Sequence, residues 1–308
     1  MIRKFELDEE MKMLLYEGAS MCELMETIRF EWCKHYYERC SEVDNISQCI
    51  MQMIELKIQS ILKLCEGVPL PSYQPAPVFL DSASIIALLR CIYEEVFIFH
   101  NLFATERNDA EKAIVLNLWK IKGINNQIFE EDDKSIDFKG KEDMLEQYAS
   151  EIEKKKEQVE SLKSEIEYLL EQLEITDKAI ETIRFQLNHQ KRSIKGYEFL
   201  KEGNIIVDFI LIDLAASPEK IFGTKKLNPL YRLLSAHSHP TYMGVFKFGV
   251  MYNTGGDIQL LRMALRGICV MSAIFINDFL SSVINGYVIK NQLPRNIKRK
   301  LDLYPQVE

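Results

Sequence analysis

Proline is missing from the middle of this sequence. The nine prolines fall within residues 69–77, 218–240 and 294–305, so the 140 positions from Val78 to Ser217 contain none. Because proline interrupts helix interiors, its absence excludes that kind of break and favours long helices over this stretch.

The cysteines form no C-x-x-C pair, and their number, seven, is odd. This pattern excludes a disulfide framework and a zinc ribbon, and it indicates reduced thiols in a cytosolic protein. The charged start, Met1 to Glu10, lacks the apolar run of a secretory signal. We therefore expect a cytoplasmic protein.

An uninterrupted apolar run of spanning length is also missing. Residues 258–289 come closest, but Arg262, Arg266, Asn277 and Asp278 interrupt them before the roughly 20 residues that a span needs. A buried core helix fits this stretch better, and we expect no membrane partner. Hydrophobic residues make up 47% of the chain, which is ample for a core.

A net positive charge is lacking, since the formal charge is −8. This excludes coating of nucleic acid by overall attraction and leaves only a local basic patch as a contact. Lys290 to Lys300 is the best such patch, and a solvated basic tail over residues 291–308 is the alternative. No glycine-rich phosphate loop or nucleophile elbow occurs, so we expect no cofactor.

Helical periodicity is clear in the N-terminal part. Residues 8–38 and 44–66 predict two amphipathic helices, which form an N-terminal helical region over residues 1–68. After a proline-rich linker, Asp81 and Ser82 predict the cap of a third helix that continues to about Phe103 and is apolar nearly all round. Such a helix belongs in the middle of a bundle. A fourth helix is expected over 109–125.

Arg90 and Glu94 are charges within this apolar third helix. A buried charge is costly unless it is paired, and the two residues stand four apart, so mutual pairing is one interpretation. The other places them in a polar pocket that faces Arg232 and His237. The two interpretations are compatible.

A strict heptad begins at Leu145. Its a positions are all apolar: Leu145, Ile152, Val159, Ile166, Leu173, Ile180, Leu187 and Ile194. We expect one coiled-coil helix over residues 141–195, on the order of 75 Å long. Its seam needs a partner, either a second copy in a homodimer through residues 145–194 or a fold-back near Glu174 to Lys178.

The C-terminal half returns to short apolar runs. Residues 205–214 suit a buried helix, with a strand as the alternative. Residues 241–254 are expected to be extended, and Asp257 is expected to cap the last long helix. The predicted fold is all-α: residues 80–140 and 197–290 form a helical bundle, and the coiled coil of residues 141–195 is inserted between its halves.

The segment from Tyr231 to Pro240 gathers two of the five histidines with an arginine and two serines. Arg232 and His237 lie about 140° apart on a helix, and fraying before Pro240 could let them converge on a small anion. Further candidate binding residues of this pocket are Arg90, Glu94, Tyr231, Ser235, His239, Arg262 and Arg266. The alternative for Arg262 and Arg266 is pairing with Asp278 or Glu94.

A metal site is the competing interpretation of the histidines. His237 and His239 form His-x-His, to which Glu94, Glu95 or His100 could add ligands. No helical ligand spacing such as Glu-x-x-His is present, and we expect no metal.

The Arg-x4-His spacing of Arg232 and His237 resembles the signature of the HEPN superfamily. The resemblance implies an all-helical, often dimeric bacterial domain that acts as a metal-independent ribonuclease in toxin–antitoxin or phage-defence systems. Arg232 would then bind the scissile phosphate of RNA, and His237 would transfer the proton. Leu233 departs from the family pattern, in which a polar residue follows the arginine.

A wider resemblance is to a family of bacterial helical domains of unknown function. Ala87 to Glu94 resembles its buried Arg-x-x-x-Glu helix, and Tyr231 to His239 resembles its later histidine segment; residues 80–125 and 197–290 would cover the domain. Two functional hypotheses follow: an HEPN-like ribonuclease, with a defence-system protein as a possible partner, or a non-catalytic coiled-coil scaffold with a structural polar pocket.

Overall fold

The computed structural model describes residues 7–69, 78–131, 142–188, 195–214, 222, 228–238, 250 and 255–305. Across these residues the chain is mostly helical, with strands only in two antiparallel pairs, so the all-α prediction is confirmed. The chain divides into two compact units: unit 1 is residues 1–104 and 214–308, and unit 2 is residues 105–213. These boundaries differ from the predicted ones, because residues 105–140 and 197–213 lie in unit 2.

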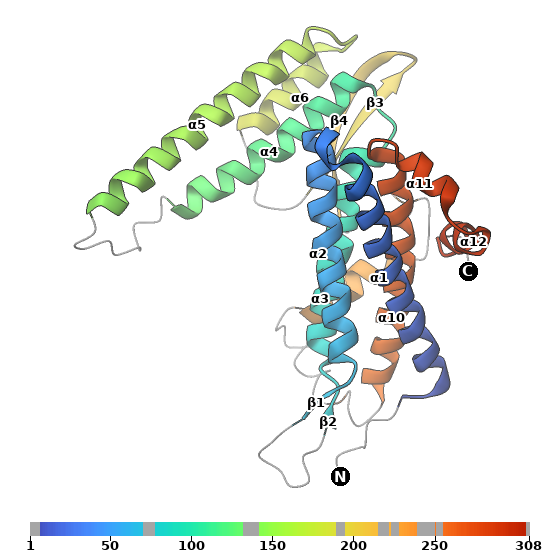
Figure 1. Cartoon of the computed structure of the whole chain (residues 1–308). Coiled ribbons are helices and arrows are strands. Elements are labelled where there is room, and N and C mark those ends of the chain that lie inside the picture. Colours follow the sequence, from blue (N-terminus) through green and yellow to red (C-terminus); the bar gives the residue numbers. More distant parts are fainter. Residues whose placement is uncertain are drawn as a thin grey trace. The chain divides into compact units, whose positions relative to one another are not determined.

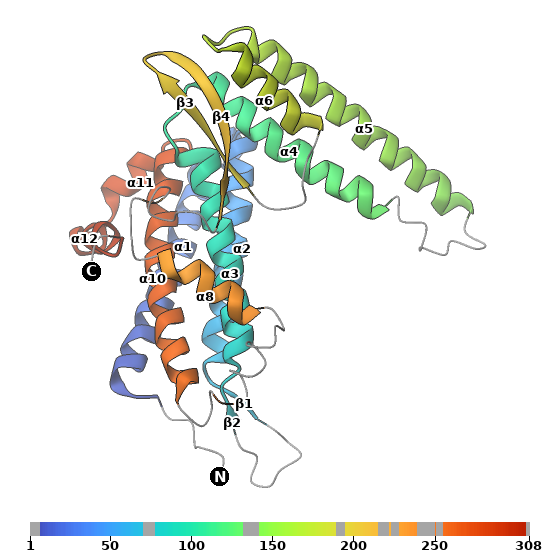
Figure 2. The same cartoon turned by 180° about the vertical axis from the view of Figure 1, so that it is seen from behind.

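Four long helices side by side form unit 1 (Figures 1 and 2). They are α1 (Glu9–Tyr36), α2 (Glu42–Leu64), α3 (Ser82–Phe99) and α10 (Gly256–Ser282). The first three confirm the predicted helices. Ser41 and Asp44 form a capping box at the start of α2, and the Asp81 carboxylate accepts a hydrogen bond from the Ser84 backbone N–H at the start of α3.

The smaller elements of unit 1 connect and cover these helices. They are the 3₁₀ turn η1 (Tyr37–Arg39), the paired strands β1 (Val68–Pro69) and β2 (Val78–Phe79), the π-helical turn η2 (His100–Ala104), α8 (Asn228–Ser238), α11 (Gly286–Gln292) and α12 (Arg295–Leu303). The region predicted as a basic tail thus contains a helix. Residues 241–254, predicted to be extended, lie outside the described residues apart from Val250.

The start of α10 differs from the prediction. The N-cap is Gly255, in the left-handed conformation with φ 75°, whereas Asp257 lies buried within the first turn. Glycine adopts a left-handed φ without a steric penalty, so Gly255 can serve as the N-cap. Asp257 then falls inside the first turn of the helix.

Aromatic side chains fill the core of unit 1. The Trp32 and Phe279 rings meet edge to face at 6.3 Å, and the Phe99 and Phe275 centroids lie 4.6 Å apart. The Trp32 indole N–H donates to the carbonyl of Ile284, so this ring also fixes the turn after α10. By length and composition α10 could cross a membrane, but 67% of its most apolar window is buried inside the protein, as expected for a core helix.

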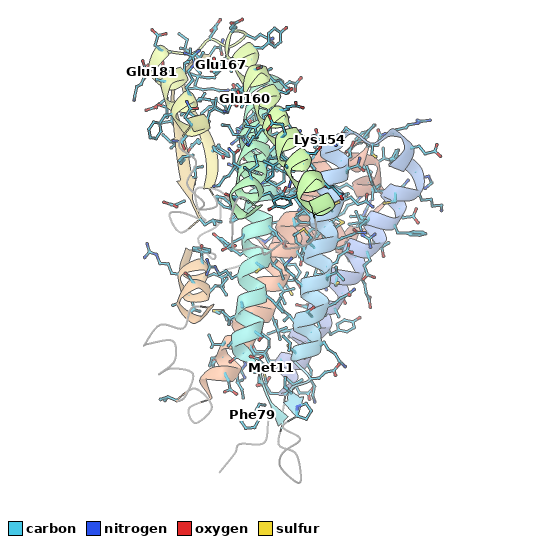
Figure 3. All side chains as sticks on the ribbon, turned by 90° about the vertical axis from the view of Figure 1, so that its left-hand side faces the viewer. Met11, Phe79, Lys154, Glu160, Glu167 and Glu181 are labelled. Carbon is cyan, nitrogen blue, oxygen red and sulfur yellow. The ribbon has the colours of Figure 1, made fainter. Side chains whose placement is uncertain are left out.

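In its described residues, unit 2 combines three helices with a β-hairpin. Its elements are α4 (Asp109–Glu131), α5 (Glu142–Leu170), α6 (Asp177–Asn188), β3 (Lys195–Glu202) and β4 (Ile205–Asp213). Helices α4 and α5 pack together, and α6 packs on β4. In Figure 3, Lys154, Glu160 and Glu167 follow one another along α5, and Glu181 lies on α6.

The single helix predicted for residues 141–195 is wrong, because α5 ends at Leu170 and α6 begins at Asp177. The chain does turn close to the predicted fold-back at Glu174 to Lys178, but the helix that packs against α5 is α4. At this turn the Thr176 N–H donates to the Ile206 carbonyl at 2.9 Å, and the Ile206 N–H donates to Glu174 at 2.8 Å. These backbone bonds to β4 replace those that a continuous helix would have made.

Residues 205–214, for which a buried helix was preferred, form β4 instead. Gly203, with φ 62°, allows the tight turn, and β4 then pairs antiparallel with β3, with one bulge at Val207. The hydrophobic residues of this run are largely β-branched, and Tyr197 and Phe199 on β3 pack against Phe209.

Candidate functional site

The predicted pocket residues meet partly, where α8 packs on α3. Leu230 and Leu234 of α8 are buried, and the Tyr231 ring lies 5.2 Å from the Tyr93 ring and 5.6 Å from the Arg90 guanidinium carbon. The buried leucines of α8 therefore hold the Tyr231 ring against the Arg90 guanidinium of α3.

Arg90 is held from two sides. Its Nε donates to Glu94 at 2.9 Å, and its Nη2 donates to the Tyr231 hydroxyl at 3.4 Å. Burial by itself would lower the pKa of Arg90, but the hydrogen bond and charge of Glu94 outweigh it, and the net pKa is raised. Pairing of Arg90 with Glu94 is thus confirmed, and Tyr231 completes the cluster.

Arg232 points away from this cluster. Its side chain is exposed, and among the described residues none pairs with its guanidinium. Helix α8 continues through Ser238, so no fraying separates positions 232 and 237, which lie about 140° apart around the axis. Ser235 is half-buried, whereas the His237 side chain and all of His239 lie outside the described residues.

Arg262 and Arg266 do not join the Arg90 cluster. Arg262 pairs with Asp8, and its Nε lies 3.5 Å from Glu10; Arg266 Nη2 lies 2.5 Å from Glu10. Pairing of either arginine with Asp278 or Glu94, the predicted alternative, is also wrong. The reason is that α1 packs along α10 and brings the acidic residues at its start to the two arginines.

The candidate metal ligands go to separate partners. Glu94 pairs with Arg90, Glu95 with Lys57 at 2.6 Å, and His100 Nδ1 with Asp278 at 2.8 Å. Within the part of the chain that the structure describes, no three metal-ligating side chains come together. Glu94, Glu95 and His100 are thus each paired with a different partner.

The pair of His100 and Asp278 was missed by sequence reasoning. The π-helical turn at the end of α3 places His100 beside α10, and the Phe222 ring covers the imidazole at 5.3 Å. The residues are 178 positions apart, and no local pattern links them. Single π-helical turns in α-helices are frequent at functional sites.

Unit 2 holds a second buried polar cluster that was not anticipated. Glu111, 1% exposed, pairs with Lys201 at 2.7 Å, and Arg107 donates to the Tyr197 carbonyl. Burial lowers the pKa of Arg107 to about 10, although Glu111 and Glu198 oppose the shift. These contacts attach the start of α4 to β3.

Comparisons with known proteins give no relative. No protein-family model matches the chain, and comparisons with curated proteins and with solved structures found no match either. The site must therefore be interpreted from its geometry alone.

Proposed function

We propose that this chain is a non-catalytic interaction protein, in which unit 1 is a stable bundle and unit 2 carries the contact with a partner. The observation that carries the proposal is the pairing of charges. Four candidate pocket residues are each engaged in an ion pair: Arg90 with Glu94 within α3, Arg262 with Asp8, and Arg266 with Glu10 of α1. Side chains whose charges are already paired with each other are less available to bind a substrate.

The turn between α5 and α6 supports a contact surface on unit 2. Arg184 Nη2 and Glu167 pair at 2.6 Å across these helices, and the neighbouring Tyr168 and Phe185 are 63% and 54% exposed. Exposed aromatic side chains next to a polar rim are typical of protein interfaces. We call Tyr168, Phe185 and this ion pair the aromatic tip.

The partner that we propose for the aromatic tip is a second copy of the chain. The heptad side chains Ile152, Val159 and Ile166 are buried within the chain, since α5 packs against α4. A second copy would thus meet the aromatic tip rather than the heptad seam. Light scattering should give the mass of a dimer for the parent protein and of a monomer for Tyr168→Lys.

The matched control is Tyr16→Lys, which places the same charge at a 73% exposed tyrosine of α1 and should leave the dimer intact. A monomeric parent, or equal loss of the dimer in both variants, would contradict the proposed contact.

An HEPN-like ribonuclease is the second candidate. Its support is the exposed Arg232 on a helix that also carries His237, five positions later. If it holds, the parent should cleave labelled RNA without added metal, and Arg232→Ala and His237→Ala should each lose that cleavage because phosphate binding and proton transfer would be removed. Arg39→Ala, an exposed arginine of η1 outside both proposed sites, is the matched control. Absence of cleavage by the parent, or equal cleavage by all variants, would leave the interaction protein as the only candidate.

A further inference from the structure

A cluster of basic residues near the C-terminus stands out against the rest of the chain. Residues 286–305 carry five basic side chains and one acidic one, a formal charge of +4, in a chain whose total is −8. The remaining residues therefore sum to −12. The basic side chains are Lys290, Arg295, Lys298, Arg299 and Lys300.

These cations are presented by a folded surface. Leu301 of α12 is 1% exposed, its carbonyl accepts from the Asn277 amide at 3.1 Å, and the Tyr304 hydroxyl donates to Glu17 at 2.7 Å. Contacts to α10 and α1 thus hold the apolar side of α12. Arg295, Arg299 and Lys300 are exposed, and Lys290 and Lys298 are half-buried. Because a folded surface holds these residues, binding has less chain to order.

Neutral partners position two of the cations. Lys290 donates to the Asn277 side-chain oxygen at 3.0 Å, and Lys298 donates to the Asn291 carbonyl at 2.8 Å. Lys300 lies 3.8 Å from Glu17. Arg295 and Arg299 are exposed and form no ion pair with the described residues, so most of the positive charge is not cancelled locally.

The start of α12 adds to the same potential. Its N-cap is Pro294, with no side-chain cap, and its first turn contains Arg295 and no acidic residue. The unsatisfied N–H groups of a helix start carry partial positive charge, so an arginine there is unfavourable for the free helix. An anion bound at this place would relieve that repulsion.

An exposed aromatic ring lies beside these cations. Tyr287 is 64% exposed and stands one helical turn before Asn291 on the same face of α11, and the Asn291 carbonyl receives the Lys298 amine. A ring next to a row of cations is the arrangement by which proteins hold single-stranded nucleic acids, since bases stack on the ring while phosphates meet the cations.

We propose that Tyr287, Lys290, Arg295, Lys298 and Arg299, here called the basic surface, bind the phosphodiester backbone of a single-stranded nucleic acid. A lipid surface fits less well, because a helix that lies on a membrane turns its apolar face to the acyl chains. The buried apolar side chain of α12, Leu301, already packs inside the protein.

The test is a fluorescence anisotropy titration of labelled single-stranded RNA and DNA over a series of salt concentrations. The parent should bind with a Kd of about 10⁻⁴–10⁻⁶ M near physiological salt, the range of nonspecific binding. Arg295→Gln with Arg299→Gln should weaken binding about ten-fold at low salt. It should also reduce the slope of log K against log salt by about 1.4, because each phosphate contact contributes about 0.7 for single strands.

The control double variant is Lys154→Gln with Lys156→Gln on α5, which removes the same charge from two exposed positions and should bind like the parent. Tyr287→Ala should lower affinity without changing the salt slope, whereas Tyr16→Ala should change neither. Equal weakening by both double variants, no binding by the parent at low salt, or binding of phosphatidylserine vesicles in place of oligonucleotides would overturn the proposal. The measurement is of binding, so it stands apart from the tests of dimerisation and RNA cleavage.

Discussion

Gly286 is a residue for which the fold has no substitute. A Cβ built at this position would stand 2.4 Å from the backbone oxygen of Leu280, because the chain turns sharply from α10 into α11. Gly123, inside α4, has no atom within 4 Å of the same imaginary Cβ. Two chemically identical substitutions should therefore have opposite effects.

Gly286→Ala should lower the free energy of unfolding by about 1–3 kcal/mol through overpacking. Gly123→Ala should raise it by about 0.5–1 kcal/mol, since alanine is the better helix former. The two tryptophans, Trp32 and Trp119, lie one in each unit, so urea unfolding followed in Trp119→Phe and Trp32→Phe backgrounds reports each substitution in its own unit. A shift of the same sign for both alanines would contradict this account.

Glu95 is a carboxylate for which burial and pairing compete. Burial raises its pKa, and the hydrogen bond from Lys57 only partly opposes the shift. Its second oxygen is buried without a hydrogen-bond partner among the described residues. Folding thus favours protonation of Glu95 relative to the unfolded chain, so this contribution to stability should be lost as pH rises from the ordinary glutamate pKa of 4.5 through the raised folded pKa.

Glu95→Gln, which is neutral at every pH, should remove this dependence. The free energy of unfolding of the variant minus that of the parent should be larger at neutral pH than at pH 4. Urea unfolding of both proteins at both pH values measures this difference. A difference between parent and variant that does not change with pH would show that Lys57 fully compensates the buried charge.

At the scale of elements, α5 stabilises unit 2 through the one face that packs against α4. Ile166 is fully buried on this helix, whereas Tyr168, two positions later, is exposed. Ile166→Ala should destabilise unit 2 by about 2–5 kcal/mol, because a core cavity forms against α4. Tyr168→Ala should change stability by no more than about 0.5 kcal/mol. Unfolding reported by Trp119 in a Trp32→Phe background checks both values, and equal effects would mean that α5 is not packed through this face.

Several elements could be predicted because local signals were strong. The cap signal at Asp81 and Ser82 and the three- and four-residue spacing identified α1, α2 and α3 correctly. The end of α5 at Leu170 could not be found in the same way. The heptad continues past it through Leu173 and Ile180, and the signal that overrides it is a backbone pairing with Ile206, which lies about 30 residues later. Local pattern carries no information about such a bond.

For the whole molecule, local pairs were predictable and distant ones were not. Arg90 and Glu94, four apart on one helix, were expected to pair and do so. Arg262 and Arg266 pair with Asp8 and Glu10 at the other end of the sequence, and only the packing of α1 on α10 determines that choice. The Arg90 cluster was thus partly foreseeable, since Tyr231 was a candidate, whereas the His100–Asp278 pair was not.

The backbone pairing of residues 174–176 with Ile206 also shields the hairpin. A two-stranded ribbon has two open sides, each able to recruit a strand from another molecule and so start aggregation. Here the turn after α5 occupies the side of β4 around Ile206, and Arg107 and Glu111 reach β3 through Tyr197 and Lys201. Although Ile205 and Leu211 remain partly exposed, these contacts leave less of the two sides open to a strand from another molecule.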